Sequence, residues 1–464
     1  MQSTKIRRVK NRIQRLEKDN EDLRAENRDL WNEISKIKGP RFPPELFDRF
    51  IDFLHRDNEA LKACSLVCRA WIPASRFHLF KRLSFHVIPP SYARNNRSYE
   101  DKVKLLDSSF CTLFKHVRQI LINGLVPPEY FQPAPSWLQS LAQHLNYFTS
   151  VTSLHLVSIS TFSISCILDA PSFTSRITNM TLEAFTCSKS KDLPYMLSYF
   201  SGLEKLHYEV HFRDMSSDWD LCPFCDMQYS ADPYARTLVV DDDSVLSPPS
   251  TLHAISIEDY SMYTRCYSGA TSALYNWLCV SDHTHLRTLK LGYLSLKNRD
   301  EMTALSSYLH GPGAILKHIR LGFETEEAMD LFSNELEALS RCSCLETFHI
   351  TSEIWPCDTS QAKLHNSVVR LSKFLLLLPI TSMKKITFNI SYAWSLHSNP
   401  KQGPNPYDIS AIDRVLHRFS VLEEITFRAD GAQGASLRSS LPNCEEKGIL
   451  RIVPRTHWMD SALG

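Results

Sequence analysis

Residues 151–156 have the sequence VTSLHL, and the related hexapeptides ITNMTL and LEKLHY follow at residues 177–182 and 203–208. All three have the pattern apolar-x-x-apolar-x-apolar, and they begin 26 residues apart. The alternation at the end of each copy, together with its β-branched residues, is typical of a short strand. Residues 192–200, between two of the copies, have helical periodicity. The pattern therefore predicts a strand and a helix that recur along the chain.

The hexapeptide motif continues in both directions from this region. One further copy lies upstream and six lie downstream, which makes ten in all. These seven are VRQILI from Val117, LHAISI from Leu252, LRTLKL from Leu286, LKHIRL from Leu316, LETFHI from Leu345, MKKITF from Met383 and LEEITF from Leu422. Helical periodicity also occurs in residues 137–147, 302–309, 328–339 and 367–378. The tail, residues 444–453, ends in an apolar run that could supply a last capping strand.

A strand and a helix at this period resemble leucine-rich repeats, which stack into a curved solenoid with a parallel sheet on the concave side. The resemblance is incomplete, because the period is uneven and the Asn or Cys that usually follows the motif is absent. We therefore predict an α/β fold with a degenerate leucine-rich-repeat solenoid over residues 111–464, interrupted by insertions at 214–250 and 393–410. The alternative is an ordinary α/β sheet domain, which does not account for ten similar motifs.

Alternate side chains of a strand point to opposite faces, so the fifth residue of each motif from VTSLHL onward, which lies between the last two apolar residues, is expected on the open face of the sheet. These positions are His155, Thr181, His207, Ser256, Lys290, Arg320, His349, Thr387 and Thr426. The candidate target-binding residues among them are His155, His207, Lys290, Arg320 and His349. Their mixed charge, with Glu183, Glu209, Glu258 and Arg428 nearby, favours a protein or peptide ligand over a polyanion. A solvated sheet face would have a similar composition.

A different pattern occupies residues 41–82, RFPPELFDRFIDFLHRDNEALKACSLVCRAWIPASRFHLFKR. Proline and Glu45 at its start favour a helix, which continues with apolar residues at helical spacing as far as Leu54. Asp57 or Asn58 could cap a second helix that runs to Trp71, with Pro73 marking its end. A third short apolar segment spans residues 76–83. These helices are too small to bury this much apolar surface alone.

The stretch resembles an F-box, the trihelical module that docks on the Skp-type adaptor of cullin-RING (SCF) ubiquitin ligases. The resemblance lies in the Pro43-Pro44-Glu45-Leu46 opening and in ACSLVCRAWIPA at residues 63–74. It implies an F-box at residues 40–85, followed by a linker at 86–110. The implied adaptor-binding residues are Phe42, Pro43, Pro44, Leu46, Phe50, Ile51, Leu54, Leu61, Cys64, Val67, Cys68 and Trp71. Phe42 stands where the family more often has Leu. An ordinary helical hairpin with core Trp and Cys residues is the alternative.

Residues 1–39 form a separate element, in which residues 5–38 follow a seven-residue repeat. The a positions hold Ile6, Ile13, Asn20, Asn27 and Ile34, and the d positions hold Val9, Leu16, Leu23, Leu30 and Ile37. This pattern favours a two-stranded parallel coiled coil in which the Asn residues fix the register. The predicted dimerisation residues are Leu16, Asn20, Leu23, Asn27 and Leu30. A solitary solvated helix, or one folded back on the body, is the alternative; a basic zipper lacks the required basic helix upstream.

The composition of the 464-residue chain limits the classes of function. The net charge of +1 gives no sign of nucleic-acid or membrane-surface binding. Thirteen scattered cysteines without a signal peptide favour reduced thiols, and hence the cytoplasm, the nucleus or both. The longest apolar run, residues 374–380, is too short to span a membrane.

Motifs for catalysis or metal binding are weak. Cys222 and Cys225 form one C-x-x-C pair, whereas structural zinc needs four ligands, and Cys342 and Cys344 are only one residue apart. His207 or His211 could complete such a site only in three dimensions. There is no P-loop, zincin motif or nucleophile elbow. We expect no cofactor, no metal and no catalysis by the chain itself.

Together, these features predict a substrate-receptor subunit of an SCF-type ubiquitin ligase, which binds the adaptor through residues 42–82 and a target protein through the repeats. A short coiled coil before the F-box resembles receptor families of mushroom-forming fungi. The alternative is a non-degradative scaffold assembled through its coiled coil and repeats. A hydrolase or transferase would need a compact polar cluster that the sequence lacks.

Overall fold

The structure of the protein is a computed structural model. It describes residues 2–36, 44–87, 98–108, 111–124, 136–159, 161–183, 185, 191–210, 247–259, 270–280, 285–294, 299–323, 329–330, 332–333, 337–352, 369–390, 409–428 and 431–454. The chain divides into two compact units, Met1–Leu79 and Phe80–Gly464, which are described separately. None of the described helices is both long enough and apolar enough to cross a membrane.

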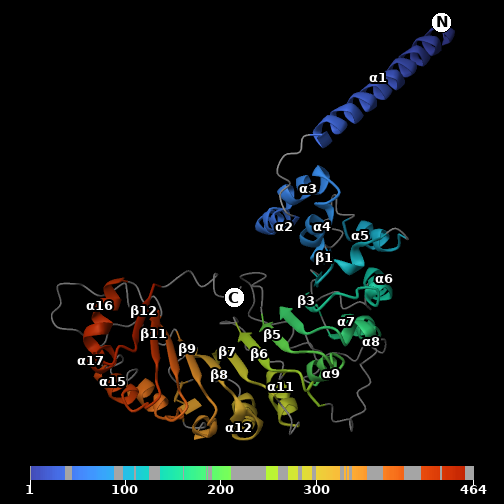
Figure 1. Cartoon of the computed structure of the whole chain (residues 1–464). Helices are drawn as coiled ribbons and strands as arrows, with labels where there is room; N and C mark the ends of the chain where they lie inside the picture. Colours follow the sequence, from blue (N-terminus) through green and yellow to red (C-terminus); the bar gives the residue numbers. More distant parts are fainter. Residues whose placement is uncertain are drawn as a thin grey trace, which may run out of the picture. The chain divides into compact units, whose positions relative to one another are not determined.

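The larger unit contains a single sheet of twelve described strands, all parallel and ordered as in the chain. The strands are β1 (Arg82–Val87), β2 (Gln119–Gly124), β3 (Ser153–Val157), β4 (Asn179–Glu183), β5 (Lys205–Val210), β6 (Ala254–Asp259), β7 (Thr288–Leu294), β8 (His318–Phe323), β9 (Thr347–Ser352), β10 (Lys385–Ile390), β11 (Glu424–Arg428) and β12 (Leu450–Val453). They line the inner side of an arc, with helices on its outer side (Figure 1). The predicted α/β fold with a curved parallel sheet is confirmed.

Each of the ten motif copies contains a strand that begins two residues after the motif starts, which gives β2 to β11. The possible strand at the end of the chain is present as β12. The sheet also has a first strand, β1, which the sequence analysis divided between the trihelical module and the linker. Phe80, two residues before β1, fits the same motif together with Leu83 and Phe85 of the strand. The sheet therefore begins one repeat earlier than residue 111.

A repeated pair of backbone hydrogen bonds joins neighbouring repeats just before each strand. The carbonyl oxygen of Thr152 accepts from the amides of Thr178 and Asn179 at 2.9 and 3.0 Å, and the carbonyl of Thr178 accepts from the next repeat in the same way. The accepting residues are Lys81, Arg118, Thr152, Thr178, Glu204, His253, Arg287, Lys317, Glu346 and Lys384. Because only backbone atoms take part, the register is maintained whatever side chain occupies this position.

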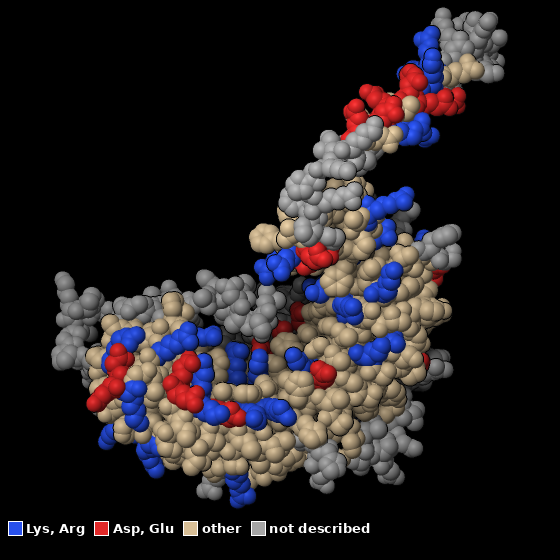
Figure 2. Space-filling model, viewed as in Figure 1, with Lys and Arg blue, Asp and Glu red and all other residues tan. Residues whose placement is uncertain are grey.

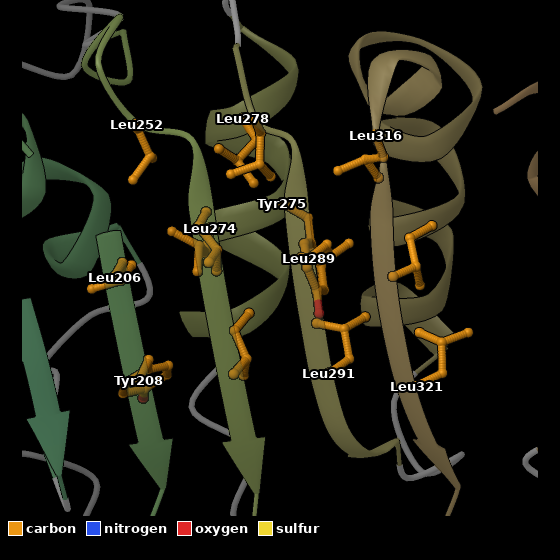
Figure 3. Close-up of a cluster of buried hydrophobic side chains, with 14 of the residues drawn as sticks. Leu206, Tyr208, Leu252, Leu274, Tyr275, Leu278, Leu289, Leu291, Leu316 and Leu321 are labelled. Atoms are coloured by element: carbon orange, nitrogen blue, oxygen red, sulfur yellow. The ribbon is translucent and has the colours of Figure 1, made fainter. Parts of the chain in front are cut away.

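The outer helices bury the other face of the sheet. They include α5 (Ser98–Leu106), α6 (Ser136–Leu145), α7 (Thr161–Leu168), α8 (Pro171–Thr174), α9 (Asp192–Ser198), α11 (Ala270–Cys279), α12 (Arg299–His310), α15 (Ser410–Leu416), α16 (Gly431–Ser440) and α17 (Pro442–Glu446), with 3₁₀ turns η1 (Leu113–Lys115), η3 (Pro312–Ile315) and η4 (Glu337–Arg341). Figure 3 shows Leu289 and Leu291 of β7 beside Tyr275 of α11. In the stretch predicted as a linker, α5 buries Val103 and Leu106 in the same core. One continuous apolar layer thus lies between the strands and the helices.

The smaller unit contains α1 (Gln2–Lys36), α2 (Pro44–Phe53), α3 (Asn58–Val67) and most of α4 (Ile72–Phe80). Asp57 caps α3, as one of two predicted candidates, because its carboxylate accepts from the amide of Ala60 at 2.9 Å. The predicted second helix was too long, since α3 ends at Val67 instead of Trp71. Proline 73 cannot continue a helix from residue 69, but it fits the first turn of a new one, so α4 begins before it.

Candidate functional site

The predicted open-face positions form one row across the sheet. In the strand register, His155 is paired with Thr181 and Thr181 with His207, and the series continues through Ser256, Lys290, Arg320, His349, Thr387 and Thr426 to Arg451. Neighbouring members are about 4.8 Å apart in the direction of the strand-to-strand hydrogen bonds. The five candidate target-binding residues therefore lie on one face, because each occupies the same position of the motif and the strands pair in register.

A second row, two residues further along each strand, has an acidic section. Glu183, Glu209 and Glu258 are paired in register on β4, β5 and β6, and we call them the acidic row. The Nε2 atom of His155 lies 3.1 Å from the Oε2 atom of Glu183, and His207 lies 3.5 Å from Glu209. Burial lowers the pKa of His155 below its ordinary value, so its ring is mainly neutral.

The other half of the open face is basic. Arg320 on β8 is paired in register with His349 on β9, and Lys290 on β7 and Arg428 on β11 lie two strands away from it. All three act electrostatically on His349, and we call these three cations the basic cluster. Figure 2 shows Lys and Arg side chains gathered in the hollow of the arc. Burial, followed by the repulsion of these cations and of Lys385, lowers the pKa of His349 to about 3. The ring of His349 is therefore neutral at physiological pH.

Two polar atoms in this basic half are buried without a hydrogen-bond partner, Nε2 of His349 and Oδ1 of Asn389. Asn389 lies on β10, in register with Arg428 on β11 and with Thr351 on β9. Burying a polar atom without a partner costs about 1–3 kcal/mol. Such atoms are uncommon in folded proteins. The described residues contain eight of them, and these two lie on the neighbouring strands β9 and β10.

A second candidate surface lies on α2 and α3. Five large apolar side chains are exposed there, and two of them, Phe53 and Leu66, are each 86% exposed. The five are Leu46, Phe50, Phe53, Leu66 and Val67, which we call the apolar patch. Trp71 is half-buried, with its ring 5.5 Å from that of Phe47 and 6.0 Å from that of Phe50. Large exposed apolar side chains grouped on two consecutive helices favour an interaction site.

The predicted adaptor-binding residues divide between core and surface. Leu46, Phe50, Val67 and Cys68 are exposed, Leu54 and Trp71 are intermediate, and Ile51, Leu61 and Cys64 are buried. Pro44 is the first residue of α2, whereas Phe42 and Pro43 lie outside the described residues. The sequence analysis missed Phe53 and Leu66. The only sequence signal for Phe53 was its three-residue spacing from Phe50, and a buried helix face has the same spacing.

On α1 the predicted dimerisation residues are all exposed. Leu16, Leu23 and Leu30 recur every seven residues along one helix, with Asn20 and Asn27 between them. A single helix gains nothing from such a leucine repeat unless another surface covers it.

Other reactive groups do not form a centre in the described part of the chain. No group of three or more His, Cys, Asp or Glu residues there could hold a metal ion. Cys342 is buried, and burial raises the pKa of its thiol to about 12. Cys222, Cys225 and His211 lie outside the described residues.

No protein-family model matches the chain, and comparison with curated proteins found no match either. Function is therefore inferred from the apolar patch and the open face of the sheet.

Proposed function

We propose that the protein is the substrate-receptor subunit of an SCF-type cullin-RING E3 ubiquitin ligase. Its α2–α4 segment acts as an F-box that binds a Skp-type adaptor, and its leucine-rich-repeat-like sheet binds the target protein. The observation that carries this proposal is the apolar patch, which lies on helices whose sequence resembles an F-box.

The apolar patch supports adaptor binding because its members are large, exposed, and confined to the consecutive helices α2 and α3. Ile51, Leu61 and Cys64 on the same helices are buried, so α2 and α3 already have a core and the patch is additional to it. Exposed apolar side chains of this size are stabilised when a partner removes them from water, by about 25 cal/mol for each square ångström. A few such residues usually dominate the affinity of an interface.

The repeat sheet supports a receptor role because it presents a long, ordered row of polar side chains. A receptor performs no chemistry of its own. It raises the effective concentration of its target near the ligase's ubiquitin-carrying enzyme, so that transfer becomes an intramolecular event within the complex.

The test is co-purification of the full-length protein with a Skp-type adaptor. We compare the wild type with the variant Leu46→Ala/Phe50→Ala/Val67→Ala, whose three side chains are exposed, so that folding should survive. The matched control is Leu105→Ala/Ile315→Ala/Leu376→Ala, which removes exposed apolar residues of the larger unit. Capture that is lost only in the first variant supports the proposal. Capture that the first variant leaves unchanged, or no capture by the wild type, rejects it in favour of a scaffold.

A further inference from the structure

The three cations of the basic cluster differ from their neighbours in having no carboxylate partner. Just before the strands, Glu346 pairs with both Lys317 and Lys384, each at 2.9 Å. Lys385 pairs with Glu424 at 2.8 Å. By contrast, Lys290, Arg320 and Arg428 form no ion pair with any described residue, and the one hydrogen bond of Arg320 goes to the hydroxyl of Thr351.

Their arrangement also has an electrostatic cost. All three cations disfavour a charged ring at His349, which is mostly buried and neutral. Lys290 and Arg320 are also direct neighbours in the strand register, so their positive charges repel each other. An anionic group placed among them would remove this cost and would strengthen its own interactions, because one side of the site excludes water.

A long polyanion does not fit this face, because the acidic row begins one strand away from the basic cluster. Glu258 on β6 is directly adjacent in register to Gly292 on β7, two residues after Lys290. A nucleic acid that followed the sheet would meet three in-register carboxylates. The charge distribution therefore fits a ligand that carries both signs of charge.

Resting on the proposed receptor function, we propose that the open face binds an extended segment of the target protein that carries an anionic group over the basic cluster and a cationic group over the acidic row. The anionic group is a carboxylate or a phosphorylated side chain, and both have the oxygen atoms that Arg and Lys bind.

The geometry fixes the spacing of the two groups. The acidic row is centred on β5 and the basic cluster on β9, four strands away. Four strand spacings are about 19 Å, which an extended chain covers in about six residues. A peptide of two lysines, four Gly/Ser residues and two glutamates, KKGSGSEE, has its charge centres that far apart.

The test measures binding of fluorescent KKGSGSEE, in both chain directions, to the full-length protein at low ionic strength. We compare the wild type with Lys290→Gln/Arg428→Gln and with Glu209→Gln/Glu258→Gln. The control Lys373→Gln/Arg418→Gln removes two exposed cations outside the open face. Each open-face variant should bind at least tenfold more weakly than the wild type, whereas the control should bind as the wild type does.

Reversing the charge of the basic cluster tests whether it selects the charge of the peptide. Lys290→Glu/Arg428→Glu should prefer KKGSGSKK over KKGSGSEE, the opposite of the wild type. A version with two phosphoserines in place of the glutamates distinguishes the two anionic sources, since tighter binding of it assigns the cluster to phosphate. Equal binding by wild type and variants, tighter binding of oligouridine RNA than of the peptide, or no saturable peptide binding would overturn the inference.

The same variants test adaptor binding and peptide binding independently of each other. The open-face variants should still capture the Skp-type adaptor, and the apolar-patch variant should still bind the peptide. A wild type that captures the adaptor but does not bind the peptide contradicts the charge-paired segment alone, whereas a wild type that binds the peptide but does not capture the adaptor contradicts the receptor function.

Discussion

The pKa of His349 depends on residues of the strands on both sides of it. Its pKa is lowered to about 3 by burial first, and then by Arg320 on β8, Arg428 on β11, Lys290 on β7 and Lys385 on β10. The sequence placed His349 on the open face, but the motif gave no information about this environment. Cations from four different strands act on one ring, and only the folded sheet brings them together.

The low pKa of His349 predicts a pH dependence of stability. The unfolded state binds a proton near pH 6.5, whereas the folded state binds it only near pH 3, so acidification between these values favours unfolding. His349→Gln removes this effect. Between pH 6.5 and 5 the wild type should lose about 2 kcal/mol more unfolding free energy than the variant. Urea denaturation at both pH values measures this difference, and parallel losses would contradict the assignment.

Gly202 marks a close approach between repeats. A Cβ atom at this position would lie 2.3 Å from the backbone oxygen of Ser175, in the turn that precedes the neighbouring strand. Because the obstacle is backbone, Gly202→Ala should cost about 1–3 kcal/mol and lower the melting temperature. Gly311→Ala is the matched control, since its Cβ would be 3.6 Å from the nearest atom. Equal melting temperatures for the two variants would refute this reasoning.

At the scale of elements, the sequence predicted the strands well because each motif copy contains two buried alternating positions. Leu154 and Leu156 of β3, both fully buried, are an example. It predicted the helices less well. α3 was extended to Trp71 because the apolar spacing continues past Val67, and Pro73 was interpreted as the end of that helix, whereas it lies in the first turn of α4.

For two other features of the fold, the sequence pattern was either assigned to a different element or gave no indication. The strand β1 fits the motif through Phe80, Leu83 and Phe85, but the helical spacing before it was extended over the same residues. The hydrogen-bond pairs between repeats involve only backbone atoms, so they cannot be predicted from the residue types at these positions. The absence of the usual Asn or Cys ladder in the sequence was therefore compatible with a regular sheet.

The helix α1 has its own test. If Leu16, Leu23 and Leu30 pair with a second copy of the chain, Leu16→Asp/Leu23→Asp should convert a dimer into a monomer, because buried carboxylates are costly in a coiled-coil seam. Asp19→Asn/Glu26→Gln is the control, since these side chains lie at flanking heptad positions. Sedimentation equilibrium measures the oligomeric state of the wild type and of both variants. A wild type that sediments as a monomer would exclude the homodimer.

At the scale of the whole molecule, the two units present surfaces of different chemistry. The α2–α4 helices expose the apolar patch, whereas the sheet exposes charged rows and keeps its apolar side chains beneath the helices. Apolar surface contributes most to affinity, and charge contributes most to partner selection and association rate. This division suits a protein that holds one constant partner and selects another.

The most direct measurement is a calorimetric titration of a purified Skp-type adaptor into the full-length protein and into its Phe53→Ala/Leu66→Ala variant. Both side chains are almost completely exposed, so their removal should not disturb the fold. If the apolar patch is the adaptor site, the variant should bind at least a hundredfold more weakly, about 2.7 kcal/mol of binding free energy. Equal dissociation constants, or no heat of binding with the wild type, would contradict the proposed function.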